Sequence, residues 1–418
     1  MMNEFTIVFL MVLAVGTSLQ FWLARRHIAH IRSHQQTVPQ AFTEKITLAD
    51  HQKAATYTLA KNRFGQQMLI VEVVILLLWT LGGLLDKLDQ AWRSLAWPEL
   101  WTGVAVLISF GLLSTLIDLP AHFYSTFRIE TQFGFNRTTP RLFFLDTFKS
   151  LFLMLLIGIP LIAIVLWLIE HTGSLWWLNV WIVWLGFSLV MIWAYPTLIA
   201  PWFNQFKPLE NDELKQRIET LLHRNGLTSQ GIFVMDGSKR SGHGNAYFTG
   251  LGNSKRIVFF DTLLEGLNTD EIEAVLAHEI GHFKRKHLPK RLLGVASLSL
   301  VGLALLGWLI QQDWFYHGLG VTTASNYMAL LLFILVLPIF TFFLQPLLAW
   351  LSRRHEFEAD DFAAQQASPL TLIQALVKLY KDNASTLTPD PLYSAFYDSH
   401  PPAPVRIAYL SSKIKPST

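Results

Sequence analysis

Long apolar segments alternate with shorter polar segments along most of the chain. An apolar segment of about 18 residues or more can cross roughly 30 Å of hydrocarbon as a helix. Seven segments of this length are present, at 5–24, 68–85, 101–119, 150–169, 175–198, 292–310 and 327–351. The pattern therefore predicts a mainly α-helical membrane protein with seven spans.

Two polar segments, 199–291 and 352–418, are too long to be simple loops. Together they are large enough for one soluble domain that is built from two separate pieces. We therefore expect spans one to five in 1–198 and the first part of the soluble domain in 199–291. Spans six and seven then occupy 292–351, and the second part of the soluble domain occupies 352–418.

The charges of the loops predict the orientation of the spans. Lys and Arg follow spans one, three and seven, for example Arg25, Arg137 and Arg353, whereas segments 170–174 and 311–326 contain neither. Short cytoplasmic loops collect Lys and Arg, so we expect the N-terminus outside and the C-terminus in the cytoplasm. The expected location is the inner membrane of a bacterium, with the endoplasmic reticulum membrane as the alternative.

Composition supports the membrane class and narrows the chemistry. The chain is 52% hydrophobic and 15% charged, whereas soluble domains carry about 25% charged residues. Its 33 Lys and Arg and 30 Asp and Glu leave a net charge of +3, which does not point to nucleic acid as a partner. There is no cysteine, which excludes disulfides and thiol chemistry, so a metal ion must be bound by His, Asp or Glu.

One segment carries a recognisable metal-binding pattern. Segment 269–288 has apolar residues at helical spacing, which predicts a helix capped at Thr269 or Asp270. It contains His278-Glu279-Ile280-Gly281-His282. Two histidines four residues apart share one helical face and can both bind zinc, and Glu279 between them can act on a water molecule.

A catalytic zinc site has three protein ligands, so a third ligand must come from elsewhere in the chain. The acidic segment 353–362, directly after span seven, offers Glu356 and Asp360. These residues are four apart and share a helical face, so one can bind the metal while the other accepts a hydrogen bond from a ligand histidine. The pattern itself leaves open which does which.

Three other histidines are interpreted without a role in metal binding. His287 lies five residues after His282, about 140° around a continuous helix, and is interpreted as interfacial. His355 is expected to face away from Glu356, because helical neighbours diverge by about 100°. His243, in a glycine-containing loop, is interpreted as solvated.

Several motifs occur in order along the chain and together resemble a known family. They are Gly134-Phe135-Asn136, Asp236-Gly237-Ser238-Lys239-Arg240-Ser241, Asn245-Ala246-Tyr247-Phe248, Phe260-Asp261-Thr262-Leu263-Leu264, the His278 to His282 pattern, Ser352-Arg353-Arg354 with Glu356 to Asp360, and Ser399-His400-Pro401-Pro402. The chain resembles the M48 zinc metalloproteases over nearly its whole length, specifically their CAAX prenyl protease 1 (Ste24-like) branch. The resemblance implies seven helices that enclose a chamber, with a thermolysin-like (gluzincin) protease domain that carries a small β element.

The resemblance also implies roles for particular residues. It implies one Zn²⁺ per chain, held by His278, His282 and Glu356. It implies Glu279 as the base that activates water, and Asp360 as the carboxylate that accepts a hydrogen bond from a ligand histidine. It also implies that His400 and Arg406 stabilise the oxyanion of the tetrahedral intermediate. One such donor contributes about 3 kcal/mol. Asn245, Ala246 and Tyr247 resemble an edge strand that pairs with an extended peptide substrate.

The expected function is hydrolysis of peptide bonds by an integral membrane zinc endopeptidase. By resemblance, its substrates are prenylated CAAX peptides, which lose their last three residues, or related membrane-associated substrates. One alternative is an HtpX-like protease for membrane-protein quality control. Another is a hollow membrane protein that binds or conducts amphipathic peptides or lipids and holds zinc structurally. The expected partners are a peptide or protein substrate, prenylated or not, and the lipid bilayer, and we expect a monomer.

Overall fold

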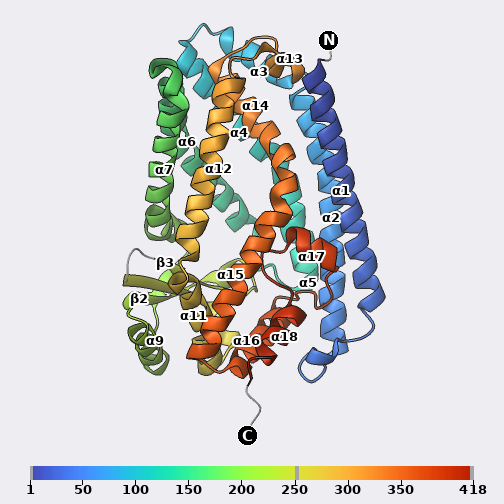
Figure 1. Ribbon diagram of the computed structural model, residues 1–418, viewed down its shortest axis with the longest axis vertical. Helices are drawn as coiled ribbons and strands as arrows, with labels where there is room; N and C mark the ends of the chain where they lie inside the picture. The colour runs from blue at the N-terminus through green and yellow to red at the C-terminus, as the bar shows by residue number, and fades with distance from the viewer. Residues whose placement is uncertain (1–2, 250–253, 415–418) are drawn as a thin grey trace.

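Long helices form the upper part of the molecule, and short helices around a small sheet form the lower part (Figure 1). The computed structural model describes residues 3–249 and 254–414. Helix α1 begins at the top of Figure 1, and α16 and α18 lie in the lower part. The two ends of the described chain therefore lie at opposite ends of the molecule.

Within the described residues, seven helices are long and apolar enough to cross a membrane, as predicted. They are Glu4–His34 (α1), Leu48–Trp79 (α2), Glu99–Phe133 (beginning with α4, Glu99–Tyr124), Pro140–His171 (α6), Gly173–Phe203 (including α7, Trp176–Ala194), His287–Leu309 (α12) and Asn326–Gln366 (α14, Asn326–Thr341, and α15, Gln345–Gln366). They have 23 to 41 residues, more than the roughly 20 that a bilayer requires. The longer ones therefore reach beyond the bilayer.

The predicted end of the second span is wrong. The apolar sequence continues to Leu85, but α2 ends at Trp79 and the chain turns at Gly83, whose φ of 74° is left-handed. Glycine adopts this conformation without a steric penalty. The apolar residues beyond the turn belong to a separate helix, α3 (Leu84–Arg93).

The lower part contains most of the short elements. Its helices are α9 (Asp212–Arg224), α10 (Asp261–Gly266), α11 (Thr269–Lys284), α16 (Pro369–Asp382), α17 (Pro391–Tyr397) and α18 (Ala403–Ser411). The short helices α5 (Thr131–Phe133) and α8 (Ala200–Phe203) end the third and fifth span helices, and α13 (Asp313–Gly318) follows span six. The strands are β1 (Phe206–Pro208), β2 (Thr228–Met235), β3 (Ala246–Thr249) and β4 (Ser254–Phe260), in the order β1-β2-β4-β3. Strand β3 is antiparallel to β4 and forms one edge of the sheet.

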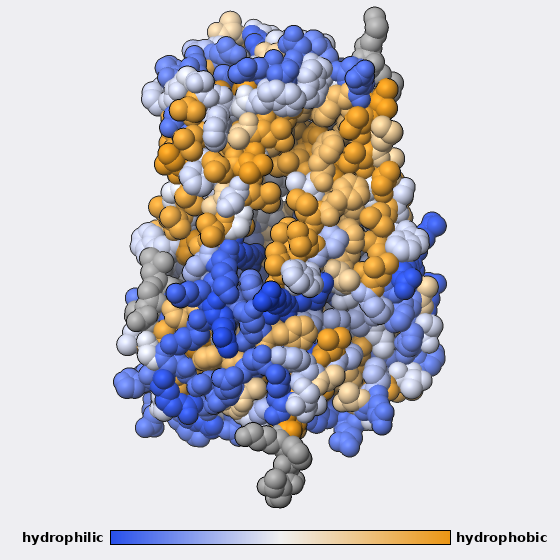
Figure 2. Space-filling view, viewed as in Figure 1, coloured by the Kyte–Doolittle hydropathy of each residue, from blue (hydrophilic) through white to orange (hydrophobic). Residues whose placement is uncertain are grey.

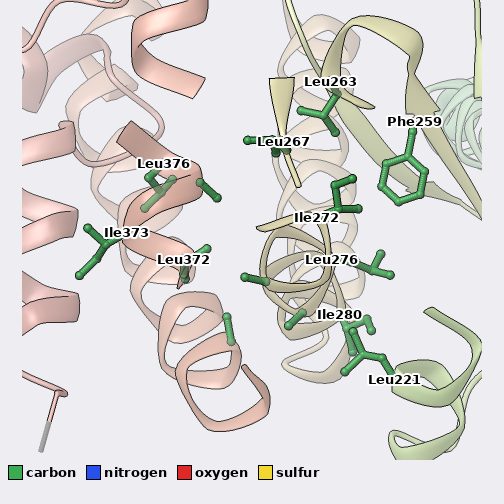
Figure 3. Packing of buried hydrophobic residues seen from close by; sticks show 14 of the residues in the cluster. Leu221, Phe259, Leu263, Leu267, Ile272, Leu276, Ile280, Leu372, Ile373 and Leu376 are labelled. Carbon is green, nitrogen blue, oxygen red and sulfur yellow. The ribbon is translucent and has the colours of Figure 1, made fainter. Parts of the chain in front are cut away.

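One hydrophobic core joins the two polar segments of the sequence. Leu276 and Ile280 of α11 lie in the same core as Leu372 and Leu376 of α16, and Figure 3 shows α11 between α16 and α9. The core also includes Phe42, from the loop between α1 and α2. The lower part is therefore built from both polar segments together with a short piece of the region before them.

The surface of the upper part is apolar. Figure 2 shows a broad hydrophobic band between hydrophilic ends, and the surface is hollowed where this band meets the lower part. Leu293, Phe148 and Val301 on the spans are 66% to 70% exposed. Apolar side chains exposed to this degree over a continuous band fit a surface that contacts lipid.

Candidate metal centre

Helix α11 carries the two histidines, and its start is fixed by a capping box. The Asn268 side chain accepts a hydrogen bond from the backbone N–H of Glu271, whose carboxylate accepts one from the N–H of Asn268. The predicted cap at Thr269 or Asp270 is therefore wrong by one or two residues. Asparagine is among the best capping residues, and both polar groups at the start of the helix are satisfied.

Three side chains converge between α11 and α15. The Nε2 atoms of His278 and His282 are 3.2 Å apart. The carboxylate of Glu356 lies 3.4 Å from the first and 3.3 Å from the second. Each residue offers one ligand atom, and these atoms all lie within 4.8 Å of one another. The structure thus brings together the three residues that the resemblance implies as metal ligands.

The chemistry and spacing of this group fit a zinc ion. Zinc bound tetrahedrally at about 2.0–2.1 Å from its ligands separates them by about 3.3 Å, close to the three distances above. Glu356 is 4% exposed, and among the described residues its Oε2 has no hydrogen bond, only longer contacts to His278 Nε2 at 3.4 Å and Arg406 Nη1 at 3.6 Å. A buried charged oxygen without a hydrogen bond is costly, and a metal ion bound at this point would satisfy it.

Asp360 supports His278 from behind. Its Oδ1 lies 2.9 Å from His278 Nδ1, so that Nδ1–H donates to the carboxylate and Nε2 points toward Glu356. Arg406 forms two hydrogen bonds to Asp360, of 2.9 and 2.6 Å. Burial and Arg406 lower the pKa of His278, but hydrogen bonds to Asp360 and Glu356 outweigh them and raise it to about 9. The two carboxylates thus favour positive charge at this site.

Arg406 is committed to this support. Its side chain is 7% exposed, and Nη1 lies 3.6 Å from Glu356. His400, in contrast, is 64% exposed and its Nε2 lies 3.4 Å from Glu356. Both residues line the cavity at the candidate metal site. Arg406 is held by its two hydrogen bonds to Asp360, whereas the His400 side chain has no such pair of bonds among the described residues.

His282 has a different support, which the sequence did not predict. Its Nδ1 lies 2.9 Å from Nδ1 of His287, and His287 Nε2 lies 3.1 Å from Glu358. His287 begins the span-six helix and is 5% exposed, but the expected angle of about 140° around a continuous helix from His282 is wrong. The helix is not continuous: α11 ends at Lys284, and Lys286 has a φ of 57°. This turn brings His287 back onto His282, while His355 stacks on His287 at 4.2 Å.

A cavity of about 590 Å³ opens at the candidate metal site. Glu279, between the two histidines, lines it together with His278 and Glu356. Asn245 and Ala246 line it as well, so the start of edge strand β3 borders the candidate metal site. Tyr247 instead lines a neighbouring cavity. The start of β3, Glu279 and two of the three candidate ligands therefore border the same cavity.

The loop before β3 is anchored, and His243, interpreted as solvated, is one-third exposed and also has several partners within the protein. Its ring stacks on Phe135 at 4.2 Å and lies 3.4 Å from Glu130. Asn383, at the end of α16, contacts His243 Nδ1 at 3.1 Å and accepts a hydrogen bond from the N–H of Gly244. These partners are distant in sequence, so no local pattern could reveal them.

Comparisons with known proteins cover nearly the whole chain. A family model described as "CAAX prenyl protease N-terminal, five membrane helices" matches residues 27–205, and one described as "Peptidase family M48" matches residues 208–414. CAAX prenyl protease 1 of Saccharomyces cerevisiae is 39% identical over 72% of this chain and 71% of its own length. The CAAX prenyl protease 1 homolog of Caenorhabditis elegans is 31% identical over 95% of this chain and 96% of its own length. The crystal structure of S. mikatae Ste24p superposes with a TM-score of 0.91, at 30% identity, covering 98% of this chain and 99% of that one.

Proposed function

The chain belongs to peptidase family M48, in its CAAX prenyl protease 1 branch, and from this premise we propose that it is a zinc enzyme that cleaves prenylated CAAX peptides. It is a multi-pass membrane metalloendopeptidase. The convergence of His278, His282 and Glu356 in the cavity that Glu279 lines carries the proposal. We propose one Zn²⁺ per chain at this group.

The residues around the site have complementary roles in the proposed mechanism. A zinc ion held here supplies a Lewis acid and lowers the pKa of water. Glu279 accepts the proton of the attacking water and passes it to the nitrogen of the leaving amine. Asp360 holds His278 with Nε2 free to bind the metal, and this orientation is supported by its 2.9 Å contact to Nδ1.

His400 and Arg406 are proposed to stabilise the oxyanion by different routes. His400 is exposed in the cavity and can donate a hydrogen bond to the carbonyl oxygen as charge develops there. Arg406 contributes its charge from a fixed position, since Asp360 binds it. We propose that Asn245, Ala246 and Tyr247 hold the peptide in extended form along the free edge of β3.

The proposed substrates are peptides with a prenylated C-terminal CAAX sequence, from which the last three residues are removed. The names of the relatives support this class. The alternatives are cleavage of membrane proteins in quality control, and non-enzymatic binding or conduction of amphipathic molecules with structural zinc. Glu279 lies between the two histidines and lines the cavity, but it is not one of the three candidate ligands. A purely structural zinc site does not need such a carboxylate.

The first test compares a farnesylated CAAX peptide with its unprenylated form, using purified protein in detergent. We expect the wild type to cleave the prenylated peptide before its last three residues. We expect Glu279→Gln to bind zinc but to lose activity by about a hundredfold to ten-thousandfold, the usual contribution of a general base. Equal cleavage of both peptides would keep the protease and reject prenyl specificity. Full activity of Glu279→Gln would reject the mechanism.

Metal analysis of the same preparations tests the ligand assignment. We expect one zinc per chain in the wild type, and a loss of zinc in His278→Ala and Glu356→Ala, because each removes one of three ligands. Glu279→Gln is the matched control, since it leaves all three ligands in place. Full zinc occupancy in both ligand variants would contradict the assignment.

We propose that the lower part of the molecule, with the C-terminus, lies in the cytoplasm. The loop charges support this orientation. The fold fits either a bacterial inner membrane or the endoplasmic reticulum membrane, and the relatives named above come from eukaryotes. A monomer is proposed because one chain supplies all the residues of the candidate site.

A further inference from the structure

A second cavity adjoins the cavity at the candidate metal site, which we call the catalytic cavity, where the loop before β3 meets α2. It has a volume of about 510 Å³ and is lined by Tyr57, Lys61 and Asn62 of α2 and by His243. We call it the α2 cavity. Asn383, Ser385, Thr386, Pro389 and Asp398 line both this cavity and the catalytic one. A peptide in the catalytic cavity therefore has the α2 cavity next to it.

Lys61 is the cation of the α2 cavity that no carboxylate neutralises at short range. Its Nζ lies over the ring of Tyr57, 4.8 Å from the centroid. In residues 3–249 and 254–414, no carboxylate oxygen lies within 4.0 Å of it. The nearby Glu130 is bound by the hydroxyl of Tyr57 at 2.6 Å and faces His243 at 3.4 Å.

The other polar groups of the α2 cavity suit an anion. Asn62, Ser385 and Thr386 offer amide and hydroxyl donors. Asp398 is the acidic residue in the lining, and burial raises the pKa of its carboxyl. A carboxylate that enters the cavity therefore meets an ammonium group and hydrogen-bond donors. Asp398 repels this carboxylate less than a fully solvated aspartate would, because its raised pKa makes its charged form less favourable.

The opposite end of β3 borders a cavity of different character. This cavity has a volume of about 580 Å³, and Tyr247, Phe248 and Thr249 contribute to its lining. Most of its other side chains are apolar: Met191, Ile192, Pro196, Met235 and Phe260. Strand β3 thus begins at the catalytic cavity, which the α2 cavity adjoins. It ends at a mainly apolar cavity beside span five, where Arg240 is paired with Asp146 at 2.8 Å.

The proposed substrate, like the surface along β3, has a charged end and an apolar end. Its prenyl group is attached to the cysteine on one side of the cleaved bond, and its free carboxylate lies three residues away on the other side. Three extended residues span about 10 Å. Matching each end to its cavity places the carboxylate at the start of β3 and the prenyl group toward its end, so that the peptide runs antiparallel to the strand.

We propose that the α2 cavity binds the C-terminal carboxylate of the peptide substrate, with Lys61 as its cation, and that this contact fixes the cleavage point three residues from the end. The inference rests on the proposed function. The contact would set the length of the released peptide at three residues, because the C-terminal carboxylate is held in the α2 cavity while the cleaved bond lies at the metal-binding group.

Peptides that differ only at the C-terminus test this inference. We expect the wild type to cleave a farnesylated peptide with a free carboxylate at least tenfold more efficiently, in kcat/KM, than the same peptide with a C-terminal amide. Lys61→Met should reduce the acid to the level of the amide, mainly through KM, and Lys61→Arg should restore the preference. Lys53→Met is the matched control, because Lys53 is on the same helix over the ring of Phe135 and does not line the cavity.

A peptide with one extra residue after the CAAX sequence tests the measurement itself. If the carboxylate is the reference point, mass spectrometry will show cleavage moved by one residue in the wild type, and a mixture of cleavage points in Lys61→Met. Cleavage of acid and amide at equal rates, or equal loss of both in Lys61→Met, would overturn the inference and leave the protease intact. If the zinc-loaded wild type cleaves none of the peptides, the proposed function fails instead.

Discussion

At the scale of single residues, the two histidines of α11 present Nε2 to the candidate metal site but rely on different partners at Nδ1. His278 donates to the buried carboxylate of Asp360. His282 faces another imidazole, His287, which in turn contacts Glu358. For His282 Nε2 to bind zinc, its Nδ1 carries the proton and donates to His287, whose Nε2–H then donates to Glu358. The orientation of both ligands is therefore fixed by groups behind them.

Replacement of His287 should weaken zinc binding without removing a ligand. We expect His287→Ala to lower zinc affinity by about tenfold to a hundredfold, the usual effect of losing such a partner. In His287→Asn the side-chain oxygen replaces Nδ1 as acceptor, so affinity should recover in part. Competition with a fluorescent chelator measures both.

His355→Ala is the matched control for this experiment. Its ring stacks on His287 at 4.2 Å but has no hydrogen bond to His282 among the contacts described. We therefore expect near-normal zinc affinity. If His287→Ala binds zinc as tightly as the wild type, the support of His282 does not depend on His287.

At the scale of elements, the site depends on how closely α11 approaches α15. Gly281 lies at this contact. A Cβ atom added to it would lie 3.0 Å from both Cα and the carbonyl oxygen of Ala359. Backbone atoms cannot rotate away, so the helices would have to separate. Gly281 thus allows Glu356, on α15, to reach the two histidines of α11.

We expect Gly281→Ala to lose zinc affinity and to lower the melting temperature, because the shift of α15 moves Glu356 and opens the core. Gly294→Ala is the control. Gly294 is also helical, but no atom of the described residues lies within 4 Å of an added Cβ. Replacing glycine by alanine in such a position stabilises a protein by about 0.4–1 kcal/mol. Its zinc affinity should match the wild type. Equal behaviour of the two variants, measured by metal titration and thermal unfolding, would show that the close contact is not required.

At the scale of the whole molecule, the metal centre is joined directly to the membrane spans. Helix α11 is separated from span six by one turn, and the helix of span seven continues into α15. The ligands therefore lie at the end of two spans, where the apolar band meets the hydrophilic lower part (Figures 1 and 2). This position suits a substrate that carries a lipid group.

The orientation of the molecule can be measured with single cysteines, because the chain has none of its own. Glu44, in the loop between α1 and α2, and Lys87, in α3, are both exposed and lie at opposite ends of the molecule. We expect an impermeant maleimide added to intact cells or right-side-out vesicles to label Lys87→Cys and not Glu44→Cys. The reverse pattern would reject a cytoplasmic protease domain.

The sequence by itself determined the features that depend on local pattern. Hydropathy predicted seven spans, because transfer of an apolar helix into lipid depends on composition over about 20 residues. Helical spacing placed His278, Glu279 and His282 on one helix, and the motifs indicated the family. The same local reasoning failed at Leu85 and His287, because a left-handed residue redirected the chain before each of them.

Only the tertiary structure decided how distant segments meet. The spacing of Glu356 and Asp360 is the same for either role, and it is the packing of α15 on α11 that puts Glu356 between the two Nε2 atoms and Asp360 behind His278. The anchoring of His243 and the place of Lys61 beside the catalytic cavity likewise depend on contacts between α2, β3 and α16. Such contacts are set by the packing of a whole core, in which each side chain fits neighbours far away in sequence.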